Sequence, residues 1–167
     1  VGLGTGKANE VQDAIKKEQK NIQLQNDIKE SSQYKNEQFK IIQETNPAPE
    51  ESNYVWIRSP KDIKTFEEAI NDDESFNWGD YSKEDALRDL KRNKVRIYSS
   101  YAIKNGVFVS TSYLQALEYA GMDRSKVHSK EINPNRVAWI NGDEGQYAHV
   151  DDKKYSQQSN KWDEHLN

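Results

Sequence analysis

Cysteine is absent from this sequence of 167 residues. The chain can therefore form neither a disulfide framework nor a thiolate metal site, and its fold depends on packing alone. Long apolar runs are missing as well. The runs present fall far short of the roughly 20 residues that span a bilayer, so we expect no membrane span. The 3 histidines lie scattered at positions 128, 149 and 165, and we expect no metal site.

Apolar residues and net positive charge are also scarce. The apolar share is 34%, beside 31% charged residues. It lies below the usual share of about 45–50%, so part of the chain contributes little to a core. The polar excess is concentrated in residues 7–53. The formal charge is −4 and the isoelectric point is about 5.5. Nucleic-acid-binding domains usually carry a basic patch or an isoelectric point above about 9, so the composition disfavours DNA or RNA as a partner.

The chain has the length of one compact domain with an additional arm, since most domains contain roughly 100 to 150 residues. Residues 1–6 alternate glycine with other residues and are predicted to form a flexible linker. Residues 7–52 are predicted to form a helical arm, because residues 8–43 lack proline and glycine and Pro47 and Pro49 then end the helix. Residues 53–167 form the predicted domain.

Within that domain, apolar spacing and turn residues predict alternating strands and helices. Ser82 and Asp85 resemble a capping box, which predicts a helix over residues 83–94 with Ala86, Leu87 and Leu90 facing inward. A further helix is expected to begin at Ser112, a typical N-cap residue. The predicted strands cover residues 54–58, 95–98, 107–109, 127–132 and 136–140.

One of these strands runs into three hydroxyl residues, in the sequence Phe-Val-Ser-Thr-Ser at 108–112. Strand alternation places Phe108 and Ser110 on one face and Val109 and Thr111 on the other. Ser110 can therefore line a cleft while its neighbours hold the strand in the core. The alternative is a strand that simply leads into an N-capped helix, which explains Ser112 without any function.

Two other places carry candidate site residues. Arg58 ends the predicted strand over residues 54–58, where a buried guanidinium would need an anionic partner such as a phosphate. The alternative is a strand-edge arginine paired with a carboxylate. The sequence Asp-Glu-Gly-Gln-Tyr at 143–147 follows a strand and an Asn-Gly turn. If it is extended, Glu144 and Gln146 lie on one face; alternatively it is an ordinary acidic hairpin tip.

Taken in chain order, the arginine, the Phe-Val-Ser-Thr-Ser strand and the Glu-Gly-Gln segment resemble the mono-ADP-ribosyltransferase toxins of the cholera and pertussis type. The resemblance covers residues 54–150. It implies an α+β fold of two packed, mainly antiparallel sheets with flanking helices, and NAD as a co-substrate without a metal. It also implies that Arg58 contacts the NAD phosphates and that Ser110 orders the nicotinamide side of the cleft, with Thr111 and Ser112 supporting the strand.

The family has Glu-x-Glu where this chain has Glu144 and Gln146. The resemblance therefore implies that Gln146 occupies the position of the catalytic glutamate, whose charge stabilises the oxocarbenium-like state as nicotinamide leaves. An amide lacks that charge, so we expect NAD binding but impaired transfer. Three explanations are open: an engineered Glu-to-Gln replacement, which we favour, a naturally inactive relative, or a register in which Glu144 is itself catalytic. A Glu-x-Glu parent favours arginine as the acceptor.

The resemblance implies an effector domain of a larger bacterial toxin that transfers ADP-ribose to a protein of a host or competitor cell. The glycine-rich start without methionine fits such a piece, which would be secreted or delivered into a target cell and act in its cytosol. Two rival functions remain. One is a non-catalytic interaction module whose arm docks a partner, and the other is a transferase acting on nucleic acid, which the acidic balance disfavours.

Overall fold

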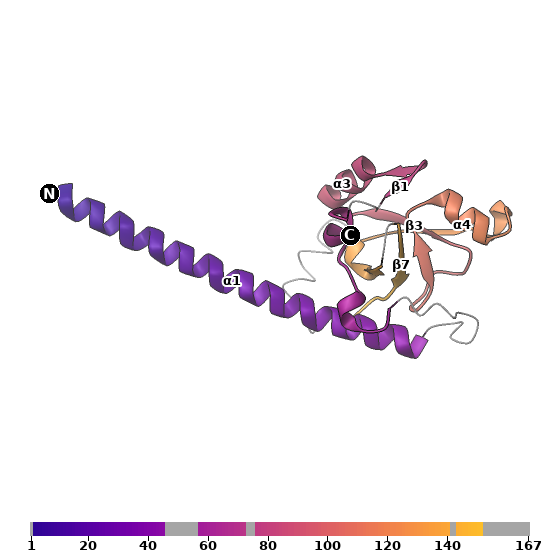
Figure 1. Ribbon diagram of the computed structural model, residues 1–167, viewed down its shortest axis with the longest axis horizontal. Coiled ribbons are helices and arrows are strands. Elements are labelled where there is room, and N and C mark those ends of the chain that lie inside the picture. Colours follow the sequence, from indigo (N-terminus) through magenta and orange to yellow (C-terminus); the bar gives the residue numbers. More distant parts are fainter. Residues whose placement is uncertain (1, 46–56, 73–75, 141–142, 152–167) are drawn as a thin grey trace. The chain divides into compact units, whose positions relative to one another are not determined.

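The computed structural model describes residues 2–45, 57–72, 76–140 and 143–151. It divides the chain into two units, Val1–Tyr34 and Lys35–Asn167. Helix α1 (Gly2–Thr45) supplies the described residues of the first unit and also the first residues of the second (Figure 1). Among the described residues, no helix combines the length and apolar character that a membrane-spanning helix requires.

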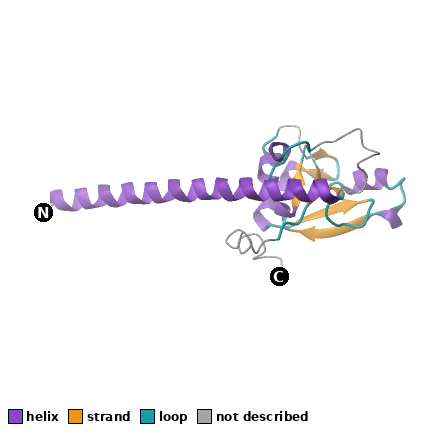
Figure 2. Cartoon of the chain, turned by 90° about the horizontal axis from the view of Figure 1, so that it is seen from below, coloured by secondary structure: helices purple, strands orange, loops and turns teal. Residues whose placement is uncertain are grey.

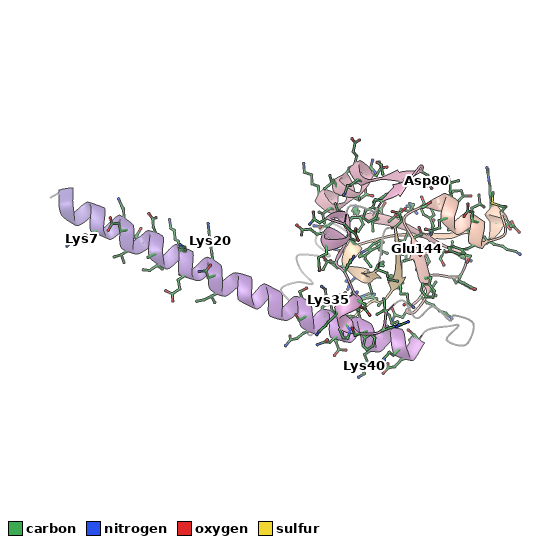
Figure 3. All side chains as sticks on the ribbon, in the orientation of Figure 1. Lys7, Lys20, Lys35, Lys40, Asp80 and Glu144 are labelled. Carbon is green, nitrogen blue, oxygen red and sulfur yellow. The ribbon has the colours of Figure 1, made fainter. Side chains whose placement is uncertain are left out.

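The described part of the first unit is a single helical segment of α1, and most of its described side chains are exposed. Its side chains are exposed throughout residues 7–22, as Lys7 and Lys20 illustrate (Figure 3), and these include the apolar Val11 and Ile15. The prediction of a flexible linker at residues 1–6 was wrong for residues 2–6, which are helical. Each residue added to an existing helix gains a backbone hydrogen bond for one residue fixed, so the helix formers that follow can extend it across the glycines.

The predicted boundary at residue 52 also differs from the structure, in which the second unit begins at Lys35. The last part of α1 belongs to this unit because Ile42 is buried in an apolar cluster with Ile57, Ile63, Ala138, Ile140 and Ala148. The Gln38 amide donates to the carbonyl of Asn135 at 3.1 Å. Residues 46–52 of the predicted arm lie outside the described residues.

The second unit alternates short helices and strands (Figures 1 and 2). Its helices are η1 (Pro60–Asp62), α2 (Phe66–Ile70), α3 (Lys83–Arg92), α4 (Tyr113–Tyr119), η2 (Arg124–Lys126) and η3 (Pro134–Arg136). Its strands are β1 (Asn77–Trp78), β2 (Tyr81–Ser82), β3 (Val95–Ser99), β4 (Phe108–Ser110), β5 (His128–Ile132), β6 (Val137–Trp139) and β7 (Glu144–Tyr147).

The central element is a five-stranded sheet with the order β5-β3-β4-β7-β6, in which every pair is antiparallel. The predicted α+β class is confirmed. Two packed sheets were expected, but the described residues add only the two-stranded β1–β2 ribbon to this sheet. Strands β3 and β4 pair only at Tyr98 and Ser110, because the chain leaves the sheet after Ser110 to enter α4.

The main core lies between one face of the sheet and helices α2 and α3. Trp139 is fully buried there, with its ring 5.0 Å from that of Phe66 and 6.4 Å from that of Phe76. Strand alternation places Val109 on this face and Ser110 on the other. Gly145 fits beside Trp139 because a Cβ at this position would lie 2.5 Å from the Val137 side chain.

Several local predictions are confirmed. The Ser82 and Asp85 side chains form the capping box of α3. The Ser112 side chain caps α4 by accepting a hydrogen bond from the backbone amide of Gln115. Other predictions were wrong. Leu87 is 50% exposed rather than inward, and Ile57 and Arg58 lie in a loop before η1 rather than in a strand. The rest of that predicted strand, residues 54–56, lies outside the described residues.

Candidate functional site

Strands β4 and β7 bring Ser110 and Glu144 together. The two residues are direct partners in the antiparallel register, so their side chains share one face of the sheet. Ser110 is 4% exposed, whereas Glu144 is partly exposed. The pair therefore combines a buried hydroxyl with a carboxylate that solvent can reach (Glu144 is labelled in Figure 3).

Helix α4 links these two side chains. The Ser110 hydroxyl donates to Oε1 of Gln115 at 2.6 Å, and the Gln115 amide nitrogen donates to the Glu144 carboxylate. The Tyr119 hydroxyl donates to the same carboxylate at 3.3 Å. Gln115 and Tyr119 lie on one helix face because they are four residues apart. The helix therefore holds Glu144 at the start of β7 through both side chains.

Helix α4 is itself fixed at its first turn by Asp80. One carboxylate oxygen of Asp80 accepts from the Ser112 hydroxyl at 2.7 Å, and the other accepts from the Leu114 amide at 2.9 Å. The Ser112 hydroxyl also accepts a hydrogen bond from the backbone amide of Gln115 at 3.1 Å. The role of Ser112 seen here is the N-cap that the sequence offered as the alternative to a site residue.

Burial affects both acids at the start of β7. It raises the pKa of Glu144, although the hydrogen bond from Tyr119 partly opposes that change. Burial raises the pKa of Asp143 to about 7, and the nearby charges of Asp80 and Glu144 act in the same direction, against a backbone hydrogen bond from Phe76. A carboxyl group that resists ionisation makes the folded state more stable at low pH than at high pH.

We predict a pH-dependent effect of the Asp143→Asn substitution on stability. The ordinary pKa of 3.8 rises to about 7 in the folded protein. The protonated Asp143 carboxyl therefore contributes stability that is fully present below pH 3.8 and is lost as the pH rises through 7. The variant should match the parent chain near pH 4 and unfold at a higher temperature than the parent at pH 8. Thermal unfolding of both proteins at pH 4 and pH 8 measures this effect. The same difference in unfolding temperature between variant and parent at both pH values would contradict the raised pKa of Asp143.

Gln146 lies in a different environment from Glu144, although both residues face the same side of β7. It is 2% exposed, its partners in the register are Phe108 and Ala138, and its amide donates to the carbonyl of Gly106 at 3.1 Å. The sequence pattern assigned the catalytic position to Gln146. The structure instead places Glu144, not Gln146, opposite Ser110.

The remaining predicted site residues fall in separate places. Arg58 is exposed, and its backbone amide donates to the Asp62 carboxylate at 2.8 Å. Thr111 is 2% exposed, and its hydroxyl has no hydrogen-bond partner within the described part of the chain. Its backbone amide donates to the carbonyl of Asp143 at 3.0 Å, which ties the end of β4 to the residue before β7.

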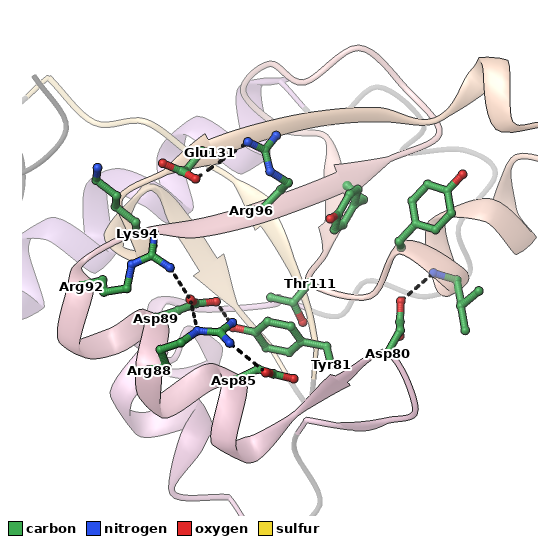
Figure 4. A pocket seen from close by; sticks show the side chains of 13 residues that line it. Asp80, Tyr81, Asp85, Arg88, Asp89, Arg92, Lys94, Arg96, Thr111 and Glu131 are labelled. Carbon is green, nitrogen blue, oxygen red and sulfur yellow. Dashed lines mark hydrogen bonds and ion pairs between the residues drawn. The ribbon is translucent and has the colours of Figure 1, made fainter.

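Thr111 also lines a cavity of about 450 Å³ that opens where β3 and β4 diverge (Figure 4). Helix α3, strands β2, β3 and β5, and the first turn of α4 contribute its other walls. Ser110, Gln115, Tyr119 and Glu144 do not line it. The cavity is therefore a second feature of the same domain, next to the Ser110–Glu144 pair and distinct from it.

Sequence analysis missed Gln115, Tyr119 and Asp80. The available signal for the first two was their spacing on the helix that Ser112 begins, since residues at positions i and i+4 share a face. Asp80 carried no such signal, because it contacts Ser112 across 32 residues of chain. A contact of that kind depends on how the β1–β2 ribbon packs beside α4.

Among the described residues, no group of three or more His, Cys, Asp or Glu side chains is placed to hold a metal ion. Comparisons of this chain with protein-family models, with curated proteins and with solved structures found no match.

Proposed function

We propose that this chain is an NAD-dependent ADP-ribosyltransferase in which Glu144 supplies the catalytic carboxylate. The observation that carries the proposal is the β4–β7 register, which sets Glu144 opposite the first serine of Ser-Thr-Ser. The finer fold proposed is that of the ADP-ribosyltransferases, in which the Ser-Thr-Ser strand leads into a helix. Of the three explanations for Gln146, this geometry favours the register in which Glu144 is catalytic.

The proposed chemistry breaks the bond between nicotinamide and its ribose. Positive charge develops on the sugar as nicotinamide leaves, and a carboxylate held beside it stabilises that charge. Gln115 and Tyr119 hold the Glu144 carboxylate in one position, which reduces the reorganisation needed at the transition state. Ser110 acts as a positioning residue, because its hydroxyl orients the Gln115 amide.

The acceptor and the setting follow from the resemblance. We propose a protein side chain of a target cell as the acceptor and the remainder of a larger toxin as a partner. The arginine acceptor predicted from the sequence assumed Glu144 to be the first acid of a Glu-x-Glu pair. With Glu144 as the catalytic acid, Gly142 holds that first position, so the proposal names no acceptor side chain. Labelling of target-cell proteins with NAD, followed by identification of the modified residue, determines the acceptor.

The proposed activity predicts that the chain releases nicotinamide from NAD and that Ser110→Ala lowers the rate about tenfold. The substitution removes the hydrogen bond to Gln115 and the one that the Ser112 backbone amide donates to Ser110. Loss of the first, which positions Glu144, corresponds to roughly 1 kcal/mol, close to the 1.4 kcal/mol of a tenfold change. The measurement is nicotinamide release by the full chain, with thermal unfolding to verify the fold. Ser125→Ala is the matched control, since Ser125 is an exposed serine on η2.

Nicotinamide release at the level of a buffer blank would contradict the enzyme proposal and favour the non-catalytic interaction module. An equal loss in Ser110→Ala and Ser125→Ala would leave Ser110 without its positioning role. Transfer of labelled ADP-ribose to DNA, with none to lysate proteins, would move the acceptor to nucleic acid.

A further inference from the structure

The cavity between β3, α3 and the first turn of α4 has an uneven charge distribution. Arg92, Lys94 and Arg96 gather at one end beside the carboxylates of Asp89 and Glu131, and Thr111 and Asp80 lie toward the other (Figure 4). The volume of about 450 Å³ is within the range of about 300–1,000 Å³ that small-molecule sites occupy. A small ligand therefore fits the size of the cavity, and its anionic end would take the place of Asp89 and Glu131 beside the cations.

The cations at this end are held only loosely by protein carboxylates. Arg92 lies 3.8 Å from Asp89, and Arg96 lies 3.8 Å from Glu131. Both separations exceed the usual hydrogen-bond length of about 2.7–3.2 Å. The Lys94 ammonium makes no ion pair with any residue in the described part of the chain. Partly exposed pairs of this kind contribute about 0–1 kcal/mol, so an incoming phosphate can replace them.

Three carboxylates of the cavity accept hydrogen bonds from neighbouring groups of the protein. Asp89 accepts from the Tyr81 hydroxyl at 2.8 Å, and Asp85 accepts from the Ser82 amide at 2.9 Å as part of the α3 cap. Asp80 holds the first turn of α4 with both of its oxygens. Asp80 and Asp85 therefore do not compete with an external anion for Arg92, Lys94 and Arg96, whereas Asp89 stays beside Arg92 and would have to be displaced.

The cavity is also lined by two aromatic rings and by the buried Thr111. Tyr98 and Tyr113 line it, with ring centroids 5.4 Å apart and an interplanar angle of 74°. The buried Thr111 hydroxyl lacks a partner among the described residues, which is unusual because buried polar groups are nearly always hydrogen-bonded. Aromatic faces stack on nucleobases.

We propose that this cavity binds a nucleoside diphosphate. The diphosphate lies against Arg92, Lys94 and Arg96, because guanidinium groups bind phosphate oxygens in pairs. The nucleoside lies toward Tyr98, Tyr113 and Thr111. The proposal is independent of the transferase activity, since none of the residues that hold Glu144 lines the cavity.

Calorimetric titration of the full chain with ADP tests the proposal, with pyrophosphate and adenosine as separate probes. We expect ADP to bind more tightly than either probe and binding to weaken as salt rises. Arg92→Gln and Arg96→Gln should each weaken ADP binding about tenfold or more, since a hydrogen bond to a charged group contributes roughly 1.5–3 kcal/mol. Arg124→Gln is the matched control, because this exposed arginine on η2 lies outside the cavity.

Tyr113→Leu distinguishes the contribution of the nucleoside from that of the diphosphate. The variant should bind ADP more weakly and pyrophosphate as the parent chain does. Absence of ADP binding, or equal affinity in the Arg92, Arg96 and Arg124 variants, would overturn the proposal. Glu144→Gln should bind ADP as the parent chain does, so failure of the transferase would leave this result intact. Inhibition of nicotinamide release by ADP would identify the ADP half of NAD as the occupant, and unchanged release would identify a free nucleotide.

Discussion

Replacing Glu144 by glutamine is expected to lower the rate of nicotinamide release from NAD by about a hundredfold or more. Removal of a single group that stabilises transition-state charge in other enzymes costs about 10²–10³ in rate. Glutamine keeps the shape of the side chain and can still accept the hydrogen bonds of Gln115 and Tyr119. The substitution therefore removes charge with little change of structure, and kcat is the quantity to measure.

Gln146→Glu is the matched comparison for this experiment. The Gln146 side chain is 2% exposed and donates to the carbonyl of Gly106. A carboxylate there loses that hydrogen bond and faces a carbonyl oxygen, which should destabilise the protein by about 1–3 kcal/mol. We expect no gain in activity. Full activity in Glu144→Gln together with a large gain in Gln146→Glu would return the catalytic position to residue 146, as the sequence pattern indicated.

Replacing Trp139 by alanine is expected to cost about 3–5 kcal/mol of folding free energy, the usual cost of removing a buried Trp or Phe side chain. Trp139 is fully buried between Phe66 and Phe76, and its indole nitrogen donates to the carbonyl of Pro134 at 2.9 Å. Domains of this size are typically stable by about 5–15 kcal/mol, so the loss is a large fraction of the total.

Denaturant unfolding of the full chain measures this change, and the thermal midpoint should fall by roughly 10 °C. Tyr101→Ala is the control, because Tyr101 is an aromatic residue that is 57% exposed. Exposed substitutions usually change stability by less than about 0.5 kcal/mol. Similar losses in the two variants would show that Trp139 is not central to the core.

The parts of the fold that depend on neighbours in sequence could be predicted. The Ser82–Asp85 capping box and the Ser112 cap are local hydrogen bonds, and both form where the residue pattern indicated. The alternation of Val109 with Ser110 follows from the geometry of any strand. Leu87 was predicted wrongly because helical spacing does not say how wide a face of the helix the sheet covers. Its neighbour Ala86 is buried and Leu90 packs against the core, whereas Leu87 is exposed.

The candidate site was predicted only in part, because it depends on the pairing of distant strands. Glu144 and Gln146 share a face in any extended strand, and sequence spacing does not distinguish them. Their difference arises from the register, which sets Glu144 opposite Ser110 and Gln146 opposite Phe108. The contact of Asp80 with Ser112 has the same origin, since the two residues meet through tertiary packing.

By itself the sequence determined the caps of α3 and α4 and the hydroxyl residues at the end of β4. Each of these depends on backbone hydrogen bonding and side-chain period over a few residues. Only the tertiary structure decided which acid lies beside Ser110, and that α1 joins the second unit from Lys35 onward. Register and burial arise from contacts between segments far apart in the chain, and no local pattern encodes those contacts.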